Sequence, residues 1–355
     1  MSKKTSGDNT KSSSQQDSQQ RCPYSGTSSG ASSATHSQPG YASTESNTYW
    51  NNVLPPLLRQ GKGRDNQDVL YNLGPLAQLI GTWVSTPQNG YNVMPLPEAT
   101  AKNGFILKNF PYYEEITFSA IADKVPNRGG KFQQNSYTLF YEQRVFFSQG
   151  PEKDQLVHAE NGSWLHLKTG PQLVGPVGIS PIPSPPAPEP IPPQNPAGSI
   201  VKQVSVPHGN SILATGGFEI IPGRPNIEAV STLPSKDGKA LPADFYIPYG
   251  PDVVNNPNVN PNAVLNATLA LTPEPVVQTT VIKVDSHHNG SVANIPFETR
   301  VINVERFSNT MWLEFLETGE VQMQYLQNIT LQFPQPDGSL IQFPHIVANT
   351  LRRIV

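Results

Sequence analysis

The chain has 355 residues and a formal net charge of -3, and only 14% of its residues are charged, against roughly 25% in typical soluble domains. Because the fraction of charged residues is low and the net charge is small, we expect no strongly basic face. A nucleic-acid partner is therefore not expected. No apolar run approaches the ~20 residues that a transmembrane helix needs, and the single cysteine, Cys22, excludes an intrachain disulfide framework.

The N-terminal segment, residues 1–46, is rich in Ser, Gln, Thr and Gly and almost free of large apolar side chains. Such a segment cannot bury enough apolar surface to offset the entropy lost on ordering. We therefore expect a disordered tail followed by one folded domain over residues 47–355. The segment also lacks the apolar core of a secretory signal, so we expect a cytoplasmic protein.

The folded domain is predicted to begin with a helix and then to continue in strands. Apolar residues between Val69 and Ile80 follow a helical spacing, and Gly74-Pro75 should divide that helix in two. Residues 81–84 then form the first predicted strand. From Val321 to Phe333 one parity is mainly apolar and the other mainly polar, which indicates a long strand with one buried and one exposed face.

Further strands are predicted along the chain, including residues 137–147 and 264–271. Strands in this number, joined in sequence-local hairpins and with almost no helix, indicate an all-β fold. We predict a single antiparallel up-and-down β-barrel of roughly eight to ten core strands, with a β-sandwich as the alternative.

Long irregular insertions should interrupt this series of strands. They lie at about residues 85–109, 171–199 and 233–262, where Pro, Asn and Gly are frequent. The second is the richest in proline, and a β ladder does not tolerate such a run, so we expect a polyproline-II loop that projects from the barrel. A stiff insertion is the simpler interpretation of this loop, and a recognition motif is the alternative.

The sequence contains no Gly-x-Ser-x-Gly elbow, Walker loop, dinucleotide-binding glycine motif or His-Glu-x-x-His motif. Histidines are therefore the main candidates for chemistry. His287 and His288 lie in a predicted turn and should be exposed, while His208 should tie a second turn. His158 and Glu160 share one parity and can form an inward pair, although a buried histidine satisfied by its neighbour is the simpler interpretation.

His345 is the candidate on the last predicted strand. It follows the turn at Pro336-Asp337-Gly338. If the sheet closes into a barrel, an imidazole on the inward parity of this strand points into an apolar cup. It is then placed to ligate the iron of a cofactor seated in the barrel mouth. A structural histidine satisfied by its neighbours is the alternative.

Five segments of the chain resemble, in order, the haem-binding β-barrel family that includes nitrobindin, which is similar in architecture to fatty-acid-binding proteins and lipocalins. The segments are residues 73–83, 112–118, 139–143, 156–164 and 344–351. The resemblance implies one barrel that contains large insertions, and haem b as its cofactor. After Gly81-Thr82-Trp83 the sequence departs from the family, because the alternating glycines and the Tyr-Pro pair of the family are mostly missing.

The family carries its axial histidine in a terminal His-x-x-Ala-x-x-Leu pattern, which His345, Ala348 and Leu351 match. The resemblance thus implies that His345 is the ligand of a ferric haem that binds nitric oxide or isomerises peroxynitrite. Two other classes stay open: a metal-free, lipocalin-like carrier of an apolar small molecule, and an interaction module that uses the polyproline loop. The sequence assigns no catalytic residue and no oligomeric state.

Overall fold

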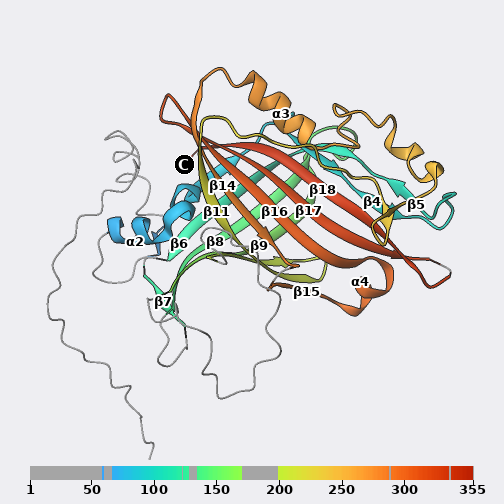
Figure 1. Cartoon of the computed structure of the whole chain (residues 1–355), viewed down its shortest axis with the longest axis horizontal. Helices are drawn as coiled ribbons and strands as arrows, with labels where there is room; N and C mark the ends of the chain where they lie inside the picture. Colours follow the sequence, from blue (N-terminus) through green and yellow to red (C-terminus); the bar gives the residue numbers. More distant parts are fainter. Residues whose placement is uncertain are drawn as a thin grey trace, which may run out of the picture. The chain divides into compact units, whose positions relative to one another are not determined.

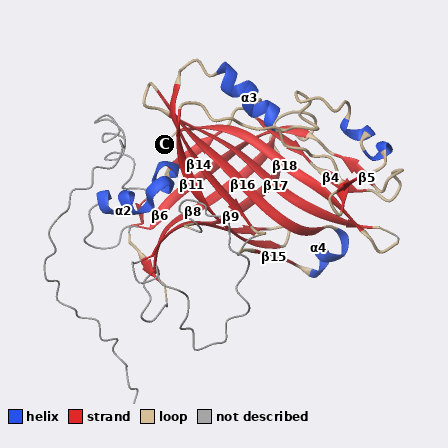
Figure 2. Ribbon diagram, viewed as in Figure 1, coloured by secondary structure: helices blue, strands red, loops and turns tan. Residues whose placement is uncertain are grey.

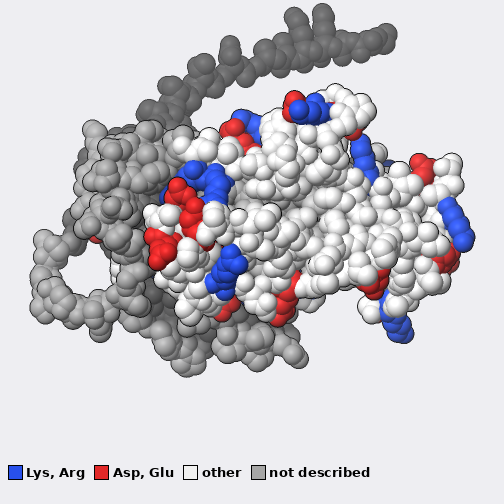
Figure 3. All heavy atoms as spheres, turned by 90° about the horizontal axis from the view of Figure 1, so that it is seen from above, with Lys and Arg blue, Asp and Glu red and all other residues white. Residues whose placement is uncertain are grey.

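A computed structural model describes residues 58–59, 66–121, 123–127, 134–169, 199–287, 289–335 and 337–354 of the chain. The tail predicted over residues 1–46 lies outside these ranges, as does nearly all of the proline-rich insertion predicted over residues 171–199. None of the helices within the described ranges is long and apolar enough to cross a membrane. On the face seen in Figure 3, acidic and basic side chains of the described residues are interspersed.

Strands make up most of the described domain (Figures 1 and 2). The helical elements are α2 (Asn66–Leu73), η1 (Gly74–Leu79), η3 (Ala243–Phe245), η4 (Ile247–Tyr249), α3 (Asn262–Leu271) and α4 (Pro296–Val301). The long strands are β6 (Phe110–Ile121), β8 (Gln134–Phe147), β9 (Leu156–Thr169), β10 (Ile200–Val206), β11 (Asn210–Pro222), β14 (Val276–Asp285), β16 (Asn303–Leu316), β17 (Val321–Pro334) and β18 (Leu340–Arg353). The shorter strands are β1 (Leu58–Arg59), β2 (Gly81–Val84), β3 (Gly90–Val93), β4 (Pro95–Pro97), β5 (Phe105–Leu107), β7 (Val125–Pro126), β12 (Ser235–Lys236), β13 (Lys239–Ala240) and β15 (Ser291–Asn294).

The sheet closes into a 10-strand antiparallel barrel. Around the barrel the order is β6, then β2 with β3, then β18, β17, β16, β14, β11, β10, β9 and β8, and the β8 pairing with β6 completes the ring. Each long strand thus pairs with its neighbour in the sequence, and β18 closes against the first strands. This arrangement confirms the predicted all-β, up-and-down barrel.

Two of the predicted insertions contain regular structure. Residues 85–109 were expected to be a loop, but they carry β3, which is part of the barrel wall, and the hairpin of β4 and β5. Strands of three or four residues are too short to show a period, and the prolines that flank them resemble loop signals. Residues 233–262 contain the short hairpin of β12 and β13 together with η3 and η4.

The strand predicted over residues 264–271 is wrong, because this segment lies in helix α3. A short run that is apolar on nearly every side fits a buried strand and a helix equally well, and the pattern alone does not separate them. In the structure Leu265 and Leu269, four residues apart, are buried. The backbone carbonyl of Leu265 accepts a 3.0 Å hydrogen bond from Gln324, so α3 covers the outer face of β17.

This cover explains a second difference from the sequence prediction. The polar parity of β17 was expected to face water, yet Gln322 and Gln324 on that face are 1% and 0% exposed. Thr272, just after α3, donates to Gln322 at 3.5 Å, and Gln324 also donates to Thr350 at 2.7 Å. The polar side chains are therefore tolerated in this layer because they bond to one another and to the helix.

The closed end of the barrel is filled by the segment that precedes the first strand. Helix α2 is followed directly by η1, so Gly74-Pro75 divides the predicted helix as expected. Trp83 on β2 is 0% exposed, and its indole Nε1 donates a 2.7 Å hydrogen bond to the carbonyl of Leu79. Leu76 and Ile80 join the same core cluster, so this end of the barrel is plugged by apolar side chains.

Glu314 in the layer beneath α3 should make the stability of the protein depend on pH. Its carboxylate is fully buried; Oε2 accepts from Gln322 at 2.6 Å, and Oε1 has no partner among the described residues. Burial raises the pKa of Glu314 from 4.5 to about 7, although the Gln322 hydrogen bond, Arg352 and Arg224 oppose this rise. A raised carboxyl pKa means that stability is fully present below about pH 4.5 and is lost as the pH rises through 7.

We therefore expect Glu314→Gln to raise the free energy of unfolding at pH 8, by an amount on the order of 1–3 kcal/mol. The gain should shrink toward pH 5, because the wild-type side chain is then protonated and neutral. Urea unfolding at both pH values measures the difference, with the exposed Glu317→Gln as a control. A gain of equal size at pH 5 and pH 8 would contradict the assignment to ionisation.

Candidate functional site: a cavity lined by three histidines

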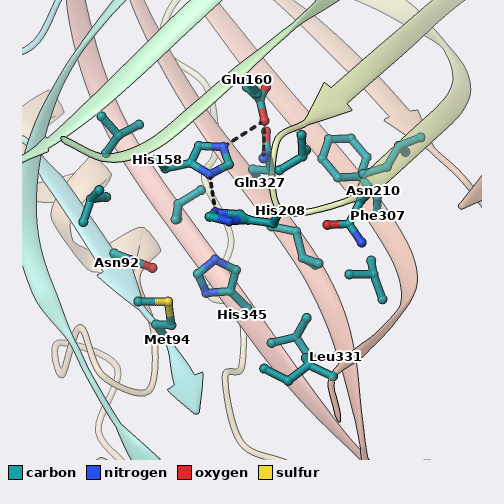
Figure 4. A pocket seen from close by; sticks show the side chains of 18 of the residues that line it. Asn92, Met94, His158, Glu160, His208, Asn210, Phe307, Gln327, Leu331 and His345 are labelled. Carbon is teal, nitrogen blue, oxygen red and sulfur yellow. Dashed lines mark hydrogen bonds and ion pairs between the residues drawn. The ribbon is translucent and has the colours of Figure 1, made fainter. Parts of the chain in front are cut away.

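The barrel encloses a cavity of about 310 Å³ between its inner wall and α4 (Figure 4). Strands β3, β6, β8, β9, β10, β11, β16, β17 and β18 all contribute lining residues. The apolar part of the lining is Met94, Pro95, Leu96, Val145, Val157, Val206, Ile212, Ile302, Val304, Phe307, Ile329, Leu331 and Val347. The polar part is Asn92, Tyr112, Gln143, His158, Glu160, His208, Asn210, Glu298, Tyr325, Gln327 and His345. A cavity of this size and mixed lining is typical of small-molecule sites.

His345 reaches the cavity from β18, where it is paired with Ile329 on β17. Its Nδ1 lies 3.0 Å from the backbone carbonyl oxygen of Val93, so this nitrogen must carry the proton and donate it. Burial lowers the pKa of His345 to about 4, and the nearby His158 and His208 add to this effect while the Val93 hydrogen bond opposes it. At neutral pH the ring is therefore uncharged. Its Nε2 keeps a lone pair, and no partner for that atom lies among the described residues.

His158 and His208 form a second group in the same cavity. Their ring nitrogens, Nδ1 of His158 and Nε2 of His208, are 3.3 Å apart, and the ring centroids are 5.3 Å apart. The other nitrogen of His158, Nε2, lies 3.5 Å from Oε2 of Glu160. The pair of His158 and Glu160, left open by the sequence, is thus present on β9, and His208 does more than tie a turn.

Lys202 on β10 forms a buried ion pair with Glu160. Its ammonium lies 3.3 Å from Oε1 of Glu160, and both side chains are almost completely buried. Burial raises the pKa of Glu160, but the Lys202 ammonium and the contact with His158 outweigh it and hold the pKa well below its usual range. Tyr141 donates a 2.9 Å hydrogen bond to the same carboxylate oxygen, and Gln327 donates to the other at 3.4 Å. Glu160 is therefore a fixed anion at the base of the cavity.

A second buried carboxylate, Glu114 on β6, lies beside the cavity and is surrounded by uncharged hydrogen-bond donors. It accepts hydrogen bonds from Tyr325 at 2.8 Å, Asn349 at 2.6 Å and Gln143 at 2.5 Å. Tyr325 also bonds Tyr112 at 2.9 Å. Burial raises the pKa of Glu114 to about 7; the nearby Glu160 carboxylate adds to this rise, and the hydrogen bonds from Tyr325, Asn349 and Gln143 oppose it.

The remaining described histidines lie elsewhere. His166 is buried, and its Nδ1 lies 2.8 Å from the carbonyl oxygen of Asn72 at the closed end of the barrel. His287 lies on an exposed turn after β14, and His288 is outside the described residues. Within the described ranges, no group of three or more His, Cys, Asp or Glu side chains is arranged to hold a metal ion.

Sequence reasoning missed Lys202 and the network around Glu114. A signal for Lys202 was present, because it falls on the buried parity of Ile200, Val204 and Val206. A lysine at such a position needs a buried partner. Tyr325 and Asn349 face each other across the hairpin of β17 and β18. No comparable signal showed that Tyr112 meets them, because it lies 213 positions before Tyr325 in the sequence.

A closed barrel with a histidine-bearing internal cavity defines a small-molecule-binding β-barrel. Residues 72–218 match the model of the family described as THAP4-like, heme-binding beta-barrel domain. The match confirms the predicted resemblance to the nitrobindin-like family of haem-binding barrels over this range, and that family supports haem as the cofactor. His158, Glu160, Lys202 and His208 lie inside the matched range, whereas His345 lies beyond it.

Two other comparisons do not bear on the family or the fold of the chain. No curated protein matches the chain. A solved structure of a candidate thioesterase II from Thermobifida fusca YX aligns with 13% identity over 79% of this chain and 81% of that chain. Its TM-score is 0.10, so the alignment carries no argument about the fold.

Proposed function

We propose that the protein binds haem b in the barrel cavity, with Nε2 of His345 as the axial ligand of the iron. The observation that carries the proposal is the hydrogen bond from Nδ1 of His345 to the Val93 carbonyl, at 3.0 Å. Histidine ligands of metals commonly donate their second ring nitrogen to a carbonyl in this way, which fixes the tautomer and leaves the ligating nitrogen unprotonated.

Other features of the cavity fit a haem. The low pKa of His345 keeps the ring in the neutral form that binds iron. The apolar side chains of β16 and β17 offer contacts for the faces of a flat macrocycle. Asn92, which lines the cavity, has a buried Oδ1 without a partner among the described residues, so a ligand that donates a hydrogen bond there would satisfy it.

A ferric haem held by one imidazole supplies an open iron position for a small ligand. As the family resemblance suggests, we propose nitric oxide or peroxynitrite as that ligand, with isomerisation of peroxynitrite as the reaction. The chain itself would orient the ring through His345 and exclude water with its apolar wall.

A haem titration tests the proposal. We expect purified protein to take up one equivalent of haem and to develop a Soret band that is shifted from that of free haem. Nitric oxide should then change the spectrum of the loaded protein. Protein that folds as a β-rich monomer or oligomer but takes up no haem would overturn the proposal.

The second candidate is a metal-free, lipocalin-like carrier of an apolar small molecule. It is favoured by the Val, Ile and Leu side chains that form much of the cavity lining. A fluorescent fatty-acid probe distinguishes the two functions. Saturable binding of the probe in protein that takes up no haem would favour the carrier.

A further inference from the structure

We propose that His158 and His208 form a binding site for a single divalent transition-metal ion of the zinc or copper type, separate from the iron ligand. The site would use Nδ1 of His158 and Nε2 of His208. It concerns the protein without haem, so it does not depend on the proposed function. Figure 4 shows the two rings side by side between Glu160 and His345, with a hydrogen bond drawn between them.

The spacing of the two nitrogens carries the inference. Imidazole nitrogens bind zinc at about 2.0–2.1 Å, so two ligands of a tetrahedral ion lie roughly 3.3 Å apart. Nδ1 of His158 and Nε2 of His208 are 3.3 Å apart. The 5.3 Å between the ring centroids agrees with the roughly 5.2 Å that the same tetrahedral geometry gives.

Glu160 supplies the support that such a ligand needs. Metal-binding histidines usually donate their second ring nitrogen to a carboxylate or carbonyl, which orients the ring and raises its basicity. Nε2 of His158 lies 3.5 Å from Oε2 of Glu160. The carboxylate is itself held by Lys202 and Tyr141, so it stays ionised and in place. This leaves the lone pair of His158 Nδ1 directed toward His208.

The ion has access to the site, and its remaining ligands are open. His208 lies on the exposed turn between β10 and β11, so a hydrated ion can reach it from solvent. Two histidines are the protein ligands, in keeping with the absence of a three-residue metal cluster among the described residues. Water would complete the coordination. Imidazole ligands favour Cu²⁺ and Zn²⁺ over Mg²⁺ or Ca²⁺, which prefer oxygen.

Calorimetric titration of haem-free, tag-free full-length protein with ZnCl₂ tests the site, and Co²⁺ gives a visible spectrum as a second readout. We expect one ion per chain at the site. His208→Ala and His158→Ala should each weaken binding at least 10-fold, and Glu160→Gln should weaken it about 10–100-fold, as outer-shell changes do. Circular dichroism of each variant checks that the barrel is intact.

Two matched variants separate this site from the others. His287→Ala removes an exposed histidine outside the cavity and should leave the affinity for Zn²⁺ unchanged. His345→Ala should also retain Zn²⁺ binding while it loses haem, so failure of the haem proposal leaves this test intact. Absence of Zn²⁺ binding by folded wild-type protein, or binding that His208→Ala does not change, would show that the two rings only share a hydrogen bond.

Discussion

Replacing His345 with alanine should abolish axial ligation of haem and lower the affinity for haem by about 100-fold or more. Losing an outer-shell partner of a metal ligand already costs 10–100-fold, and the ligand itself should cost at least as much. The apo fold should survive, because His345 is only partly buried and its one hydrogen bond goes to the backbone of Val93. Haem titration followed at the Soret band, with circular dichroism as the folding check, measures both effects.

His208→Ala is the matched control, since this histidine lines the same cavity, on the turn between β10 and β11, but is not the proposed iron ligand. We expect its haem spectrum to stay nearly unchanged. In a metal-free carrier, His345→Ala should alter the affinity for an apolar ligand only modestly, because one imidazole is a small share of a large apolar contact. A His345→Ala variant that keeps the wild-type Soret band would disprove the ligand assignment.

Much of the barrel could be predicted from the alternation of apolar and polar residues in the sequence. The 14-residue strand β17 carries Met323, Tyr325 and Ile329 on one parity, and this parity faces the barrel interior. Because β17 pairs with β18 in a continuous antiparallel register, Ile329 fixes the place of His345 opposite it. A period of two over so many residues leaves little freedom, which is why both the fold and the position of this histidine could be predicted.

The features that the sequence did not predict depend on contacts between segments that are distant in the sequence. The segment of helix α3 was predicted to be a strand, because a short apolar run has no decisive period. The contact between this helix and Gln324 is a tertiary contact that the local sequence does not show. His208 lies in a turn, where sequence patterns give no side-chain direction. Its proximity to His158 arises only because β9 and β10 pair in the barrel. The inward direction of His345 and the pair of His158 and Glu160 could therefore be predicted, whereas the positions of Lys202 and His208 could not.

Truncating Trp83 to alanine should lower the free energy of unfolding by about 3–5 kcal/mol, the range found for large aromatic side chains in cores. Trp83 is 0% exposed, lies in the core cluster at the closed end, and donates a 2.7 Å hydrogen bond to Leu79. The Arg353 guanidinium also lies 5.3 Å from the ring centroid. Alanine would leave a cavity between η1 and the barrel wall that these rigid neighbours cannot refill. Urea unfolding measures the loss.

Trp83→Phe separates the two parts of this contribution. Phenylalanine keeps most of the apolar bulk but cannot donate to the Leu79 carbonyl, so it should cost much less than alanine. The lost hydrogen bond accounts for about 1 kcal/mol, with a further penalty for the buried carbonyl that is left unpaired. The closed end lies away from His345, so the variant that stays folded should bind haem with the affinity of the wild type. If Trp83→Ala unfolds at the same urea concentration as the wild type, η1 does not seal the barrel, and the packing of this end must differ from that described.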